Sequence, residues 1–230
     1  MSAVIEVENL EFSFDGRRPV LRGIRFQLEP GGSLAVLGAN GSGKSTLLWC
    51  ILGLLKARGV VRLFGEPRTR RSLARVGVVF QNPEDQLFMP RLVEDLSLTL
   101  VNRGHPPAEA SQAALRALES AGLGHAANLP ASQLSLGQRK RAAIAAALVC
   151  QPELLVLDEP TAELDGRSAR LLRERLKLLP VAKLIATHDL GLAREVCERV
   201  LLLEDGEVLA EGSAAEILSD SALLERAGLI

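Results

Sequence analysis

The chain has 230 residues, of which 47% are hydrophobic and 24% are charged, and its formal net charge is -1. This length and composition are typical of one globular domain with a sizeable core. The balanced charge gives no support for a protein that binds nucleic acid through a basic surface.

No segment is expected to enter a membrane or to direct export. The start of the chain, MSAVIEVENLEF, contains neither a basic region nor an apolar run. The longest apolar run, residues 142–150, has about half the length of a membrane-spanning helix. The cysteines are odd in number and widely spaced (Cys50, Cys150 and Cys197), so we expect buried free thiols rather than disulfides or a zinc site.

The first segment predicts a small antiparallel β layer. Turn signals separate short strand-like runs, which lie at residues 4–7, 12–14 and 24–28. The continuous apolar run at 33–37 then predicts a buried strand. A largely apolar helix is expected after it, from about 44 to 55.

The remainder alternates helices with short apolar strands. Helices are predicted at about 106–122, 135–150, 166–179 and 189–197, strands at 154–157 and 184–187, and a hairpin at 200–208. Such alternation predicts a mostly parallel sheet that is covered on both faces.

The strongest motif is GANGSGKS at residues 38–45, which fits the phosphate-binding loop and lies between a buried strand and a helix. Backbone N–H groups of such a loop surround a phosphate chain, and the helix N-terminus adds positive potential. Lys44 can reach the β- and γ-phosphates, and the Ser45 hydroxyl can hold Mg²⁺. The expected nucleotide-binding residues here are Gly38, Asn40, Gly41, Ser42, Gly43, Lys44, Ser45 and Thr46.

The second motif is LLVLDE at residues 154–159, where a buried strand delivers two acids to its carboxyl end. Asp158 is expected near the Mg²⁺ ion, and Glu159 can orient and partly deprotonate the attacking water. Together the two motifs predict a Mg²⁺-dependent nucleotide hydrolase.

A third motif identifies the kind of hydrolase. Residues 134–141, LSLGQRKR, resemble the LSGGQ signature of the ATP-binding cassette (ABC) ATPase family. In that family the signature, here Ser135, Leu136, Gly137 and Gln138, grips the γ-phosphate held by the other subunit. Leu136 replaces the usual glycine, which keeps the backbone N–H but can change how closely the two halves approach.

Other positions match the family in order, and the resemblance spans about residues 4–212. It implies that Gln81 touches Mg²⁺ and senses a membrane partner, that Asp165 lies in a loop at the dimer interface, and that His188 contacts the γ-phosphate. Phe14 is expected to stack on adenine in preference to Phe12. Stacking contacts the flat face of a base and distinguishes adenine only weakly from guanine, so GTP is an alternative to ATP.

The resemblance implies an α/β fold of the P-loop NTPase type, with a RecA-like core, a mostly parallel sheet, an N-terminal antiparallel β subdomain and an inserted α-helical subdomain. We expect one ABC ATPase domain over residues 1–230. Its parts are the β layer (about 1–36), the nucleotide-binding core (37–82 and 151–230) and the helical signature subdomain (83–150).

The resemblance further implies ATP and Mg²⁺ as ligands and a head-to-tail dimer, because one chain supplies two half-sites. We expect a homodimer, and pairing with a paralogous subunit stays open. The dimer would lie peripherally on the cytoplasmic face of the cell membrane, with a transmembrane scaffold and substrate-binding membrane subunits and without nucleic acid.

Residues 79–88, VFQNPEDQLF, resemble one subgroup, the ATPases of energy-coupling-factor importers for cobalt, nickel and vitamins. In these systems the segment faces the scaffold, so Leu87, Phe88 and Met89 are either partner contacts or core residues. The short tail after the last hairpin favours a cobalt or nickel importer, with a vitamin importer as the alternative. The ion would be handled by membrane components, because the scattered histidines and cysteines lack ligand spacing.

Two other function classes are alternatives to the transporter. A soluble ABC ATPase of DNA repair or translation would carry long insertions or a second cassette, which this sequence lacks. A regulatory cassette that does not hydrolyse ATP is disfavoured because Glu159 and His188 are both present.

Overall fold

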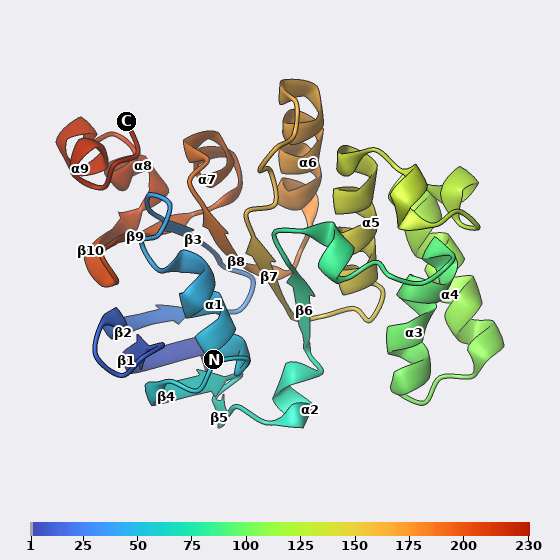
Figure 1. Cartoon of the computed structure of the whole chain (residues 1–230), viewed down its shortest axis with the longest axis horizontal. Helices are drawn as coiled ribbons and strands as arrows, with labels where there is room; N and C mark the ends of the chain where they lie inside the picture. Colours follow the sequence, from blue (N-terminus) through green and yellow to red (C-terminus); the bar gives the residue numbers. More distant parts are fainter. Residues whose placement is uncertain (1) are drawn as a thin grey trace.

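The computed structural model describes residues 2–230, which form two sheets with helices packed against them (Figure 1). The antiparallel sheet contains β1 (Ile5–Ser13), β2 (Pro19–Leu28), β4 (Arg58–Leu63) and β5 (Glu66–Pro67), in the order β2-β1-β4-β5. The core sheet contains β3 (Ser33–Leu37), β6 (Val76–Val79), β7 (Leu154–Asp158), β8 (Ala182–Thr187), β9 (Arg199–Glu204) and β10 (Glu207–Ser213), in the order β10-β9-β3-β8-β7-β6. The core sheet is parallel apart from the β9–β10 hairpin.

The core sheet is buried on both faces, and each face has its own apolar core. Along β3, Leu34 and Val36 belong to the core shared with the antiparallel sheet and α1 (Lys44–Leu52). Ala35 and Leu37 belong to the core formed with the helices on the other face. Successive side chains of a strand point to opposite faces, which explains why this strand reads as one continuous apolar run.

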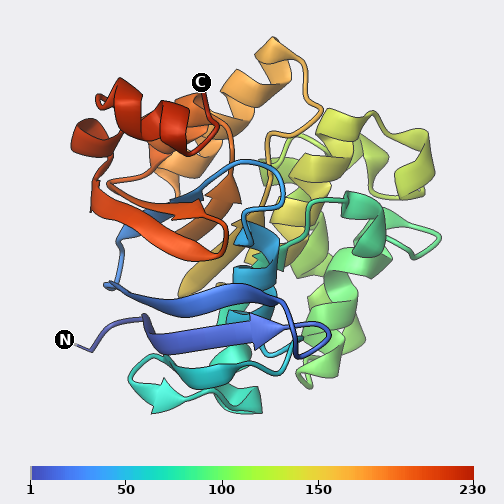
Figure 2. The same ribbon diagram turned by 60° about the vertical axis from the view of Figure 1, so that its left-hand side comes forward.

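Most of the remaining helices cover the face of the core sheet opposite the antiparallel sheet, and α3 and α4 lie at the end of the sheet beyond β6 (Figures 1 and 2). The helices other than α1 are α2 (Arg70–Leu73), α3 (Leu92–Asn102), α4 (Pro107–Ser120), α5 (Leu136–Leu148), α6 (Gly166–Leu178), α7 (Leu190–Val196), α8 (Ala214–Ile217) and α9 (Ser221–Arg226). Single 3-10 turns occur at η1 (Pro83–Asp85), η2 (Gly124–Ala126) and η3 (Ala131–Gln133). Within residues 2–230, each helix is too short or too polar to cross a membrane.

The sequence predicts that the antiparallel β layer ends at about residue 36, but the sheet also includes β4 and β5. β4 pairs with β1 in a register that places Leu63 opposite Ile5 and Val61 opposite Val7. Residues 58–67 therefore belong to this sheet rather than to the core segment 37–82, and β3 belongs to the core sheet. Strand partners far apart in the sequence are chosen by burial in the folded chain, which a short alternating run does not reveal.

Two local boundaries also differ from the prediction. Most of the two runs, residues 5–7 and 12–13, forms the single strand β1, which continues through an irregularity at Asn9, a residue with φ 48°. Helix α1 ends at Leu52 rather than at residue 55, because Gly53 adopts the left-handed conformation (φ 79°) that closes a helix.

The three cysteines are free, as expected, but only two of them are buried. Burial raises the pKa of Cys50 to about 11 and that of Cys197 to about 12, so both thiols stay protonated at neutral pH. Cys150 is half-buried.

The segment after β6 is fixed by its own polar side chains. Gln86 accepts a hydrogen bond from the Phe80 N–H (2.8 Å) and donates one to the Val78 carbonyl (2.7 Å). From α3, Oδ1 of the buried Asp95 accepts the N–H groups of Phe88 and Met89, each at 3.0 Å. Burial raises the pKa of Asp95, and these two N–H bonds oppose the rise.

The two hydrogen bonds to Asp95 predict different free energies of unfolding for the variants D95A and D95N. D95A leaves two backbone N–H groups without their acceptor and is expected to lower the free energy of unfolding by about 1–3 kcal/mol. D95N keeps an acceptor oxygen and removes a buried charge, so its stability at pH 7 is expected to equal or exceed that of wild type. Urea denaturation measures both.

The pH dependence provides the control. Because the pKa of Asp95 is raised in the folded state, the wild type gains stability as pH falls through that pKa, whereas D95N lacks this gain. The advantage of D95N should therefore be smaller at an acidic pH below the raised pKa of Asp95 than at pH 7. An equal loss in D95N and D95A at both pH values would contradict this account.

Candidate functional site

The phosphate loop joins the carboxyl end of β3 to the start of α1. Gly41 (φ 85°) and Gly43 (φ 104°) are in the left-handed region, where other residues are strained. A Cβ atom at Gly38 would collide with Ser42 Oγ and the Leu203 carbonyl. These glycines allow the loop to turn sharply and to present the N-terminus of α1 to an anion.

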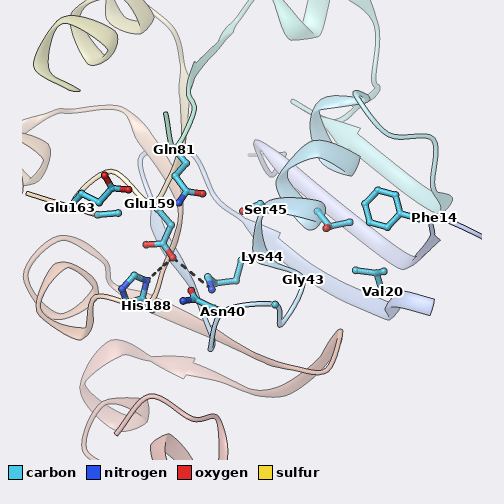
Figure 3. A pocket seen from close by; sticks show the side chains of 13 residues that line it. Phe14, Val20, Asn40, Gly43, Lys44, Ser45, Gln81, Glu159, Glu163 and His188 are labelled. Atoms are coloured by element: carbon cyan, nitrogen blue, oxygen red, sulfur yellow. Dashed lines mark hydrogen bonds and ion pairs between the residues drawn. The ribbon is translucent and has the colours of Figure 1, made fainter. Parts of the chain in front are cut away.

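Lys44 is buried within this loop. Its Nζ donates to the carbonyls of Gly38 (2.8 Å) and Ala39 (3.0 Å), and it lies 3.7 Å from Oε1 of Glu159 (Figure 3). Burial lowers the pKa of Lys44, and the charges of Glu159 and Asp158 raise it again. Two loop carbonyls and one carboxylate therefore surround the ammonium group at the wall of the cavity.

Glu159 follows β7 and turns its carboxylate into the same cavity. It has φ 43°, and its N–H donates to the Ala186 carbonyl of β8 at 2.8 Å. Its Oε2 accepts a hydrogen bond from Thr187 Oγ1 (3.0 Å), and its Oε1 lies 2.9 Å from Nδ1 of His188. Three strands thus bring Lys44, Glu159 and His188 to one edge of the sheet.

Asp158 and Ser45 form a pair of oxygen donors beside this group. Ser45 Oγ donates to Asp158 Oδ1 at 3.0 Å. Burial raises the pKa of Asp158, and the hydrogen bond from Ser45 opposes the rise. Gln81, at the end of β6, lines the cavity with Ser45 and Glu159 (Figure 3). A hydroxyl, a carboxylate and an amide oxygen fit Mg²⁺, which takes one or two carboxylates together with phosphates and water.

The cavity has a volume of about 600 Å³ and runs from His188 and Glu159 to Phe14 (Figure 3). The residues that line it include Asn40, Gly41, Gly43, Lys44, Ser45 and Thr46, whereas Gly38 and Ser42 shape the loop from behind it. An extended cavity lined by charged and polar side chains suits an elongated, charged ligand.

Phe14 lies just beyond the end of β1 and is 66% exposed. Phe12 lies within the strand and is half-buried, and the two rings meet edge to face with centroids 4.8 Å apart. Because Phe14 lies outside the strand, strand alternation does not determine the direction of its ring. Val20, which lines the cavity near Phe14, was not predicted from the sequence.

The signature residues lie outside this cavity. Ser135 caps α5: its Oγ accepts the Gln138 N–H (3.3 Å), and Gln138 Oε1 accepts the Ser135 N–H (2.9 Å). Ser135, Gly137 and Gln138 line a separate small pocket beside α6, whose first turn is capped by Asp165. One chain therefore does not bring its phosphate loop and its signature together.

Comparison with known proteins identifies the family of this chain. The family description "ABC transporter" matches residues 21–162. A chain of Gloeobacter violaceus that bears the name of an ABC transporter ATP-binding protein is 45% identical over 97% of this chain and 94% of its own length. The energy-coupling factor transporter ATP-binding protein EcfA of Methanothermobacter thermautotrophicus is 40% identical over 98% and 76%, respectively.

Two solved structures share the fold. CbiO1 from Clostridium perfringens, described as part of the ABC transporter complex cbiONQ, is 32% identical, with a TM-score of 0.85 over 100% of this chain and 96% of that one. The ATP-binding cassette MJ0796, solved as a dimer in a post-hydrolysis state with ADP and Pi, is 29% identical, with a TM-score of 0.80 over 91% and 98%.

These matches confirm the P-loop NTPase fold class expected from the sequence, with its helical subdomain and its partly parallel sheet. They also confirm the resemblance to ABC and energy-coupling-factor ATPases. The chain belongs to the ABC transporter family and is an ATP-binding subunit of the ABC ATPase type.

Proposed function

We propose that this chain hydrolyses ATP with Mg²⁺ to power import through a membrane partner of the energy-coupling-factor kind. The observation that carries the hydrolytic part is the cluster of Lys44, Asp158, Glu159 and His188 beneath the phosphate loop. The similarity to EcfA and CbiO1 along nearly the whole chain supports the transporter type.

In this proposal the side chains have separate tasks. Lys44 and the loop N–H groups bind the β- and γ-phosphates, and the outward-facing imidazole of His188 contacts the γ-phosphate. Glu159 orients water for in-line attack and accepts its proton. Ser45, Asp158 and Gln81 would hold Mg²⁺, which neutralises phosphate charge when it is bound. Phe14 supports the base of the nucleotide by stacking.

The site is completed by a second chain. Ser135 and the N–H of Gly137 lie at the start of α5, a 13-residue helix whose N-terminus favours an anion. Because they lie apart from the phosphate loop of their own chain, we propose that they contact the γ-phosphate held by a partner in a head-to-tail homodimer. Asp165, at the start of α6, accepts a hydrogen bond from Ser168 (2.7 Å), which lines the same small pocket as Ser135 and Gly137, and it would face the same interface.

The membrane partner is proposed to contact the segment after β6. Leu87 is 5% exposed and belongs to the helical core, whereas Phe88 is 67% exposed and Met89 is partly exposed. Asn82, Glu84 and Asp85, which precede Phe88 in the sequence, are exposed polar residues. An exposed aromatic ring with a polar rim is typical of a docking point.

The remaining finer proposals concern location and cargo. The chain would lie peripherally on the cytoplasmic face of the membrane, bound to a transmembrane scaffold and to substrate-binding subunits. We propose cobalt or nickel as the cargo, with a vitamin as the competing cargo; the resemblance of residues 79–88 to energy-coupling-factor ATPases supports this group of cargoes. Because the membrane subunits would bind the cargo, identifying those subunits tests the cargo, whereas ATP hydrolysis does not.

The base assignment predicts that E159Q lowers kcat by roughly 10²–10⁴-fold. The amide keeps the size of the side chain but cannot accept a proton, so ATP binding and ATP-driven dimerisation should persist. Single-turnover hydrolysis and size-exclusion chromatography with ATP measure the two properties. Full turnover together with normal dimerisation would refute the assignment.

The partner proposal predicts that wild-type chain, captured from detergent-solubilised native membranes, brings down a membrane scaffold and a substrate-binding membrane subunit. F88S should lose both while keeping its own ATPase activity, because Phe88 lies outside the nucleotide cavity. L178S is the matched control, since Leu178 is 81% exposed on α6. Recovery of soluble proteins alone, or equal recovery with F88S, would contradict the proposal.

A further inference from the structure

One buried cation near the site is not used in the mechanism above. Lys140 lies on α5, five positions after the signature serine, and is only 4% exposed. Its Nζ donates to the backbone carbonyl of Glu159 at 2.9 Å. Among residues 2–230 no carboxylate lies within salt-bridge distance of Lys140.

The surroundings of Lys140 do not favour a charged group for stability alone. Burial lowers its pKa, and the charges of Glu163, Glu159 and Asp158 oppose this from a distance. A buried ammonium group with one carbonyl acceptor is costly compared with an apolar side chain of the same shape. Such departures from a stability-optimised core concentrate at functional sites.

The bond from Lys140 acts on the backbone that aims the Glu159 carboxylate. The N–H of Glu159 is fixed by the Ala186 carbonyl of β8 (2.8 Å), and its C=O is fixed by Lys140 of α5. The residue between these two anchors has the left-handed φ of 43°. Its orientation is therefore set jointly by the core sheet and by the signature helix.

The same helix bears two other functional contacts. Its first residues carry the signature, and Arg139 Nη1 lies 2.6 Å from Oε1 of Glu84 in the segment after β6. A movement of α5, whether from the partner's nucleotide or from that segment, would be transmitted to the Glu159 backbone through one hydrogen bond.

We propose that Lys140 is a positioning residue that ties the signature helix to the backbone of Glu159, so that the carboxylate is aimed only when α5 is in place. The inference rests on the proposed role of Glu159 as the base. It assigns to Lys140 no contact with ATP.

The test compares K140M and K140R with K183M. Methionine is unbranched like lysine and ends at the position of Cε, so it keeps most of the packing but donates no hydrogen bond, whereas arginine retains donors. Lys183 is a matched control because it is also buried and donates only to backbone carbonyls, those of Leu179 (2.8 Å) and Val181 (2.9 Å). It lies in β8 and does not line the cavity.

K140M is expected to lower kcat about tenfold or more, because a small error in the position of the carboxylate is costly. The KM for ATP and the affinity for ATP should stay within about twofold of wild type. K140R should recover most of the turnover, and K183M should keep it, with thermal unfolding recorded for each variant. A kcat of K140M within about twofold of wild type, or a loss shared equally by K183M, would overturn the proposal.

A double-mutant cycle separates this inference from the base assignment. If Lys140 acts through Glu159, K140M lowers the residual kcat of E159Q by less than it lowers that of wild type. An undiminished effect of K140M in E159Q would overturn the positioning role. Full turnover of E159Q alone would instead refute the proposed base.

Discussion

The register of three parallel strands determines where every proposed catalytic group lies. Leu37 of β3 pairs with Thr187 of β8, and Asp158 of β7 pairs with Ala186, so the three strands end at one edge. The phosphate loop, Glu159 and His188 follow directly from those ends. A slip of one residue in β7 would turn Asp158 to the opposite face of the sheet, so the apolar packing of both faces also fixes the site.

The candidate site contains two lysines and two acidic residues whose side chains are buried and therefore lose contact with water. Lys44, Lys140, Asp158 and Glu159 are each between 4% and 6% exposed. Burial is the main cause of the lowered pKa of Lys44 and of the raised pKa of Asp158, so the neighbouring charges only partly compensate for lost hydration. Two cations and two anions make the burial tolerable, and the phosphates of ATP would supply further negative charge to the cations. Buried charges of this kind are typical of functional sites, where stability is exchanged for activity.

Local motifs made much of this site predictable from the sequence. The phosphate loop was recognisable because its glycines, Lys44 and Ser45 lie in eight consecutive positions between a strand and a helix. Asp158 and Glu159 were recognisable because a buried strand places them at its carboxyl end. The structure brings these residues together at the carboxyl edge of the core sheet.

Features that depend on distant partners were less predictable. The pairing of β4 with β1 and the choice between Leu87 and Phe88 as the exposed side chain both require the folded core. The left-handed backbone of Glu159 depends on its bond to Ala186, and Lys140 has the sequence context of an ordinary helix residue. The only sequence feature that points to a buried position for Lys140 is its place just before the apolar run that starts at Ala142.

The central claim is that each ATP site is shared by two chains, and mixing two inactive variants tests it most directly. K44A disables the phosphate loop, and S135R disables the signature, so each homodimer has two defective sites. In a mixed dimer one site combines the intact loop of one chain with the intact signature of the other. The account predicts that an equal mixture recovers about a quarter of wild-type turnover. A mixture no more active than either variant alone, with mixed dimers present, would contradict it.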